Sequence, residues 1–95
     1  MPERNLYALS VEGPAMEPRF REGETIYVDP NERAEHSRFI IVAHDGETPV
    51  LRQLVMEGKR KMLKAINPSW PAQIQPMPSD AIICGVVVVK GEVLI

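Results

Sequence analysis

The stretch Phe39-Ile40-Ile41-Val42-Ala43-His44-Asp45-Gly46 decides the fold. Its first five residues are apolar and mostly β-branched or aromatic, which favours an extended strand. The Asp45-Gly46 pair that follows is the strongest short hairpin signal in the chain, because these residue types suit a tight turn between antiparallel strands. A second apolar segment, residues 50–56, is therefore expected to return beside the first.

Short apolar segments separated by turn residues continue on both sides of this hairpin. Nine prolines in 95 residues are about twice the average usage. Because proline breaks helix interiors and central strands alike, the elements between the prolines must be short. The expected strands are residues 6–11, 25–28, 39–43, 50–56, 61–66 and 82–89.

Helical periodicity is almost absent. The apolar pair Met16 and Phe20 predicts at most a single helical turn, and no window indicates an amphipathic helix of roughly ten residues or more. The sequence therefore predicts a mostly β protein: one compact, twisted antiparallel β domain over residues 1–95, with hairpin connections.

Composition excludes several classes of protein. The hydrophobic and charged fractions, 44% and 25%, are typical of a soluble globular domain, and no apolar run reaches the roughly 20 residues that span a bilayer. We expect a cytoplasmic protein, because one cysteine excludes an intrachain disulfide. The lack of an apolar run long enough to span a bilayer predicts no membrane contact. His36 and His44 are too few for a metal site, and no cofactor is indicated. A net charge of -2 argues against this chain holding nucleic acid by itself.

Five short sequence motifs, in the same order as in a known family, indicate a family resemblance. The segment Val11-Glu12-Gly13-Pro14-Ala15-Met16-Glu17-Pro18 resembles the V-x-G-x-S-M-x-P segment of the LexA-like self-cleaving serine peptidases. This group includes LexA, UmuD and the C-terminal domains of lambdoid phage repressors. The other four motifs, each followed by the family pattern that it resembles, are residues 21–29 (x-D-G-D-x-V-x-V-D), Arg52-Gln53-Leu54 (K-R-L or K-Q-L), Asn67-Pro68-Ser69-Trp70 (N-P-x-Y) and Ile83-Cys84-Gly85-Val86-Val87 (I-x-G-x-V).

The resemblance covers nearly the whole chain, from Leu9 to about Val89. It implies a fold of the LexA and signal-peptidase type. It also implies a serine nucleophile at residue 15, with the turn residues Gly13 and Met16 beside the oxyanion donors, and a lysine base on a neighbouring strand. The residues agree with this placement, because Gly13 permits a tight turn and Pro14 fixes φ just before a helical turn, so that free backbone N–H groups surround residue 15.

Two departures from the family pattern remove the expected chemistry. Residue 15 is alanine, whose methyl group has no lone pair with which to attack a carbonyl, and Ser10 lies outside the motif. Counting back from Gln53-Leu54 places the base at Arg52, which we prefer, whereas counting forward from Gly46-Glu47 places it at Leu51. Arginine keeps its proton and leucine has none to exchange, so neither acts as a base. We therefore predict that this chain is not an enzyme and has no intact catalytic residue.

The resemblance implies the C-terminal dimerisation and regulatory domain of a transcriptional repressor of the phage or SOS-response type. Operator DNA would then be bound by an N-terminal domain outside these 95 residues, and the cleavage loop would also lie outside them. A RecA-type protein would be an activator. Two alternatives stay open: a self-cleaving Ser–Lys peptidase inactivated by substitution, and a UmuD-like polymerase accessory protein. The residues alone do not decide whether Ala15 is native.

Residues 82–89 predict either a strand buried on both faces or one that is half in an interface. A long apolar strand exposed at a sheet edge promotes aggregation, and a two-fold partner removes that exposure. We therefore expect a homodimer joined through the C-terminal segment, with these interface residues: Val86, Val88, Val93, Leu94 and Ile95.

Four other features have less specific predictions. Arg52 is expected either to be a solvated charge or to hold the site closed by donating to backbone carbonyls. Trp70 is expected to pack on the sheet, with a partner contact as the alternative. Cys84 is expected to be a small buried strand residue. The basic residues Lys59-Arg60-Lys61, with Lys64, are expected to solvate a hairpin tip.

Overall fold

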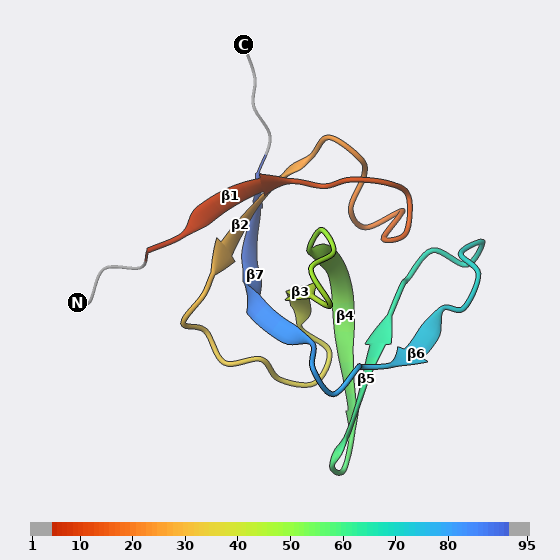
Figure 1. Ribbon diagram of the computed structural model, residues 1–95. Helices are drawn as coiled ribbons and strands as arrows, with labels where there is room; N and C mark the ends of the chain where they lie inside the picture. Colours follow the sequence, from red (N-terminus) through yellow and green to blue (C-terminus); the bar gives the residue numbers. More distant parts are fainter. Residues whose placement is uncertain (1–4, 92–95) are drawn as a thin grey trace.

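The computed structural model describes residues 5–91, in which seven strands form one antiparallel sheet and no helix occurs (Figure 1). The order across the sheet is β1-β2-β7-β3-β4-β5-β6. This confirms the mostly β antiparallel domain. The strands are β1 (Tyr7–Ser10), β2 (Thr25–Asp29), β3 (Phe39–Ala43), β4 (Val50–Glu57), β5 (Arg60–Lys64), β6 (Ile74–Pro76) and β7 (Ile82–Gly91).

The hairpin between β3 and β4 forms where the sequence predicts it. Asp45 and Gly46 both have positive φ angles, 49° and 71°, which a turn of this kind requires, and Val42 pairs with Val50 across the hairpin. The next turn, at Gly58, also has a positive φ angle, and it joins β4 to β5. The β4–β5 hairpin extends away from the other strands (Figure 1).

Strand β7 lies inside the sheet, paired with β2 on one side and with β3 on the other. The argument that placed an exposed edge strand here is therefore wrong, because β-branched residues on both faces also suit an interior strand. Val86 is 2% exposed and belongs to this chain's own core, so its side chain is not available to a partner. Val88 is half-buried against the core. The other three expected interface residues, Val93, Leu94 and Ile95, lie outside the described residues.

The buried side chains form two clusters. The first, called cluster one, combines residues of β2, β3 and β4 with residues of the loop that follows β1 and with one residue that follows β5: Val11, Ala15, Met16, Phe20, Ile26, Val28, Ile41, Leu51 and Ala65. The second, cluster two, comes from β3, β4 and β7 alone: Ile40, Val42, Leu54 and Val86. Alternation along a strand explains the division, because neighbours such as Ile40 and Ile41 point to opposite faces of the sheet.

The loop between β1 and β2 is fixed by one helical turn and by its ends. The Phe20 N–H donates to the Met16 carbonyl at 2.9 Å, and both side chains are buried in cluster one, as the apolar spacing predicted. The Val11 N–H donates to the Glu24 carbonyl at 2.9 Å, which closes the base of the loop. Within residues 5–91, no helix is long and apolar enough to cross a membrane.

Candidate functional site

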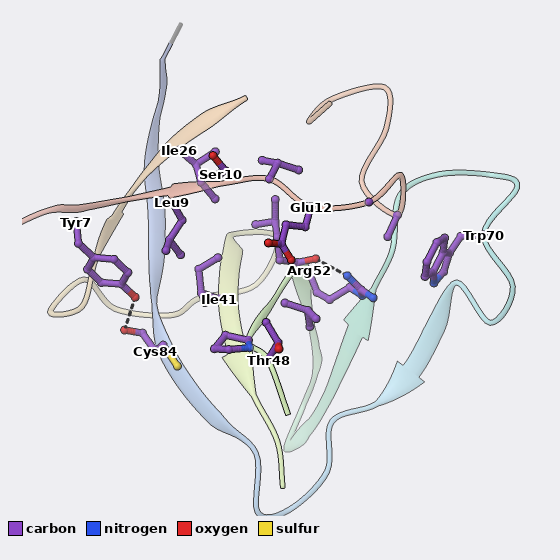
Figure 2. A pocket seen from close by; sticks show the side chains of 16 residues that line it. Tyr7, Leu9, Ser10, Glu12, Ile26, Ile41, Thr48, Arg52, Trp70 and Cys84 are labelled. Atoms are coloured by element: carbon purple, nitrogen blue, oxygen red, sulfur yellow. Dashed lines mark hydrogen bonds between the residues drawn. The ribbon is translucent and has the colours of Figure 1, made fainter. Parts of the chain in front are cut away.

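A cavity of about 650 Å³ opens beside β1 and the start of β4 (Figure 2). Its volume lies within the range typical of ligand sites, roughly 300–1,000 Å³. Two runs of consecutive residues line it, 9–13 on one side and 48–52 on the other. The remaining lining residues are Tyr7, Ala15, Ile26, Ile41, Trp70 and Cys84.

Ala15 lies at this cavity, in a turn that is held by Asn67, a residue far away in the sequence. Its side chain is 5% exposed and packs in cluster one. The Ala15 carbonyl accepts a hydrogen bond from the Asn67 N–H at 3.0 Å, and the Pro14 carbonyl accepts one from Asn67 Nδ2 at 2.8 Å. Asn67 also caps its own turn, because its Oδ1 accepts from the Ser69 N–H. The bracing of residue 15 by Asn67 was not predicted, and the Asn-Pro turn signal was its only trace in the sequence.

Both residues considered for the base position line the same cavity as Ala15. Leu51 is 8% exposed and packs with Ala15 in cluster one. Arg52 is half-buried, and its Nη1 donates to the Leu51 carbonyl at 2.7 Å. Its guanidinium carbon lies 5.7 Å from the centre of the Trp70 ring, and Figure 2 shows the side chain directed toward Trp70. The structure therefore brings Ala15, Leu51 and Arg52 together at one cavity.

The charge of Arg52 is retained in this setting. Burial lowers the pKa of the guanidinium from its ordinary value, because desolvation disfavours a cation. That ordinary value is so high that arginine stays protonated in proteins. Arg52 therefore supplies a positive charge and N–H donors to the cavity and does not accept a proton.

Three hydroxyl groups also line the cavity, on Tyr7, Ser10 and Thr48. The Tyr7 hydroxyl donates to the Cys84 carbonyl at 3.3 Å, and burial, followed by the nearby Cys84 side chain, raises the pKa of Tyr7. Among the described lining residues there is no lysine or histidine, so no nitrogen base stands beside these hydroxyls. The described residues also contain no group of three or more His, Cys, Asp or Glu side chains able to hold a metal ion.

The remaining predicted site residues lie at the cavity or in cluster one. Gly13, with a φ angle of 75°, lines the cavity, whereas the Met16 side chain is 2% exposed within cluster one. Trp70 packs against cluster one, as expected. Cys84 is only half-buried and lines the cavity.

The basic and histidine residues lie away from the cavity. Lys59, Arg60 and Lys61 are exposed at the β4–β5 hairpin tip. His36 is held by a backbone contact, because its Nδ1 accepts from the Met56 N–H at 2.9 Å. His44 Nε2 lies 2.9 Å from Asp80 Oδ1 at the surface. These contacts place both histidines in structural roles within surface segments.

Comparison with known proteins gives one family and a consistent set of relatives. The sequence profile described as Peptidase S24-like matches residues 1–88. Prophage repressor CohE of Escherichia coli is 33% identical over 87 residues, which cover 90% of this chain and 39% of the relative. The HTH-type transcriptional regulator for conjugative element SXT of Vibrio cholerae is 38% identical over 80 residues, covering 82% of this chain and 36% of the relative.

A third relative, an HTH-type transcriptional regulator of Coxiella burnetii, is 41% identical over 63 residues, covering 65% of this chain and 29% of the relative. The chain thus spans between 29% and 39% of the length of these curated relatives.

Proposed function

Because the chain belongs to the Peptidase S24-like family, we propose that it is the regulatory domain of a prophage-type transcriptional repressor, that it self-associates, and that it cleaves no peptide bond. The names of its relatives support the first part, since they include a prophage repressor and HTH-type transcriptional regulators. In this proposal operator binding belongs to another part of the repressor, in the cytoplasm. Self-association of this domain would bring two DNA-binding domains to two half-sites.

The proposed loss of catalysis is inferred mainly from one observation, that the residue at this turn of the cavity is Ala15. A serine at this turn would have the hydroxyl that acyl transfer needs, whereas a methyl group forms no covalent intermediate. Arg52 and Leu51, the candidate base positions, line the same cavity and neither accepts a proton. The same fold is then left with a shaped apolar cavity and no nucleophile and base pair, which suits binding and regulation.

Self-association is supported by exposed apolar side chains on β7. Val89 is 49% exposed although it lies in a central strand, opposite Tyr27. It borders a groove lined by Phe39, Val87 and Val88, among others. An exposed apolar patch of this kind is a candidate interface, and a two-fold axis allows the same patch on two copies to cover each other. We therefore place the proposed interface at Val89 and the groove beside it, whose lining also includes Arg19 and Lys90.

Light scattering on the 95-residue chain at micromolar concentration tests this part of the proposal. Val89→Glu puts a charge into the proposed interface, and the expected result is a dimer for the wild type and a monomer for the variant. Ile74→Glu is the matched control, because Ile74 is 53% exposed on the edge strand β6, away from the patch, and this variant should remain a dimer. A monomeric wild type contradicts self-association, and a dimer that survives Val89→Glu contradicts the interface.

A further inference from the structure

Arg52 is the only cation on the lining of the cavity within the described chain, and it has no acidic partner there. The ion pairs found among residues 5–91 do not include it, and Glu12, the one carboxylate on the lining, lies beyond ion-pair distance. A half-buried arginine is usually paired, because removing a charge from water is costly. This one is compensated only by a backbone carbonyl and the face of Trp70.

The guanidinium keeps donors that are open to the cavity or to solvent. Arginine has five N–H donors, and the contact with the Leu51 carbonyl uses only one of its two terminal nitrogens. In the described residues, every fully buried side-chain nitrogen or oxygen has a hydrogen-bond partner, so the remaining donors of Arg52 are accessible. A planar fork of this kind matches the two oxygens of a carboxylate.

The other walls of the cavity are mostly apolar. Leu9, Val11, Ile26, Ile41 and Leu51 line it, and all but Leu9 belong to cluster one. Ala15 adds a methyl group to these walls. Hydrocarbon is stabilised by such walls at about 25 cal/mol per Å² of apolar surface removed from water. The site therefore offers one cation at the end of an apolar space.

We propose that this cavity binds an apolar molecule that carries a carboxylate, with the carboxylate on Arg52 and the hydrocarbon against the walls formed by Ile26, Ile41 and Leu51. The proposal rests on the proposed function only in that the cavity binds its ligand and does not cleave it. Two sources supply this chemistry, a free alkyl carboxylic acid and the C-terminal end of an apolar peptide. Each leaves the Leu51 carbonyl contact of Arg52 in place, because the N–H donors on Nε and Nη2 remain to receive the two carboxylate oxygens.

Trp70 provides a built-in probe, since it is the only tryptophan in the chain and its ring faces the Arg52 guanidinium. The experiment titrates octanoate, octanamide, an acetylated valyl-leucine acid and its amide against the 95-residue chain, and follows tryptophan fluorescence. A saturable change is expected for the acids, with at least about tenfold weaker binding of the matching amides. The tighter of the two acids identifies the source of the ligand.

Three variants separate the role of Arg52 from general effects. Arg52→Gln should lose the preference for acid over amide, and Arg52→Lys should keep part of it, because it retains the charge without the fork. Arg60→Gln is the control, since it removes the same charge at the exposed hairpin tip and should bind as the wild type does. Glu12→Gln should bind the acids a few-fold more tightly, because it removes a like charge from the lining.

The proposal is overturned by three results: no saturable fluorescence change for either acid at millimolar concentration, equal binding of acid and amide to the wild type, or an acid preference that survives Arg52→Gln. If Arg52→Gln does not fold, as judged by circular dichroism, the preference measured in the wild type against Arg52→Lys and Glu12→Gln decides. None of these results depends on dimerisation or on cleavage, so failure here is distinguishable from failure of the proposed function.

Discussion

The two buried clusters differ in what builds them. Cluster two takes its fully buried residues from β3, β4 and β7 only, whereas cluster one combines strand residues with the loop residues Val11, Ala15, Met16 and Phe20. Only cluster one borders the 650 Å³ cavity. Cluster two is packed between neighbouring strands of the sheet, whereas the loop residues of cluster one form part of the cavity wall. The difference shows that the cavity is formed by the loop after β1 packing on the sheet, whereas cluster two is formed by the sheet alone.

Leu54→Ala and Leu51→Ala test this difference on one strand and should give the largest effect. Leu54 is 1% exposed in cluster two, and its truncation should lower the free energy of unfolding by about 3–5 kcal/mol, because a closed core is left with a void. Leu51 is 8% exposed and already borders the cavity, so the same truncation should cost about 2 kcal/mol. Urea unfolding measures both. Equal losses would mean that the two clusters are packed alike.

Gly85→Ala tests the close approach of β7 to Val28 and Asp29 of β2. A Cβ at Gly85 would lie 2.5 Å from Val28 Cγ1 and 3.1 Å from the Asp29 carbonyl oxygen, so the sheet must shift. The expected loss is about 1–3 kcal/mol in the free energy of unfolding. Gly91→Ala is the control, because its Cβ meets only the Tyr27 ring, at 2.9 Å, and it should cost less. A Gly85 variant as stable as the control would contradict this close approach.

The smallest expected effect concerns pH and the loop of cluster one. The Arg21 N–H donates to Glu24 Oε1, and this hydrogen bond, more than the nearby Lys90, lowers the pKa of the Glu24 carboxyl. A lowered folded-state pKa contributes stability above the ordinary carboxyl pKa, and the contribution is lost as the pH falls through the folded-state value.

Glu24→Gln should therefore be slightly less stable than the wild type near neutral pH, and the two should converge as the pH falls through the lowered pKa of the Glu24 carboxyl. Urea midpoints across this range give the comparison, with Glu57→Gln at the exposed end of β4 as the control. A constant difference at every pH would mean that the carboxylate charge has no part in holding the loop.

Much of the sheet was predictable from short-range patterns. The Asp45-Gly46 turn and the β-branched runs fixed β3, β4 and β7, because hairpin turns and alternating burial are properties of neighbouring residues. The position of β7 inside the sheet was not predictable, since its pairing with β2 and β3 joins residues far apart in the chain. Strand β6 was not predicted either. Its three residues are exposed and the last is Pro76, so the segment has neither alternating burial nor a residue type typical of strands at its end.

The site was predictable only where a motif names a position. The motifs around Ala15 and Arg52 predicted that these two residues lie at one site, and both line the cavity. The contacts that hold them were not predictable: Asn67 bonds the Pro14 and Ala15 carbonyls across 53 and 52 residues of sequence, and Trp70, in the same turn as Asn67, faces Arg52 on β4. Such contacts depend on tertiary packing, which no local pattern encodes.

Covalent labelling by a fluorophosphonate at alkaline pH, read by intact mass and peptide mapping, tests most directly whether this cavity has lost its nucleophile. The wild type should gain no adduct, and Ala15→Ser with Arg52→Lys should gain one at residue 15. Ala15→Ser alone should react more slowly by about 10²–10⁴-fold, because no general base assists its hydroxyl. An adduct on the wild-type chain at Ser10 or Thr48, or a single variant as reactive as the double one, would contradict the account.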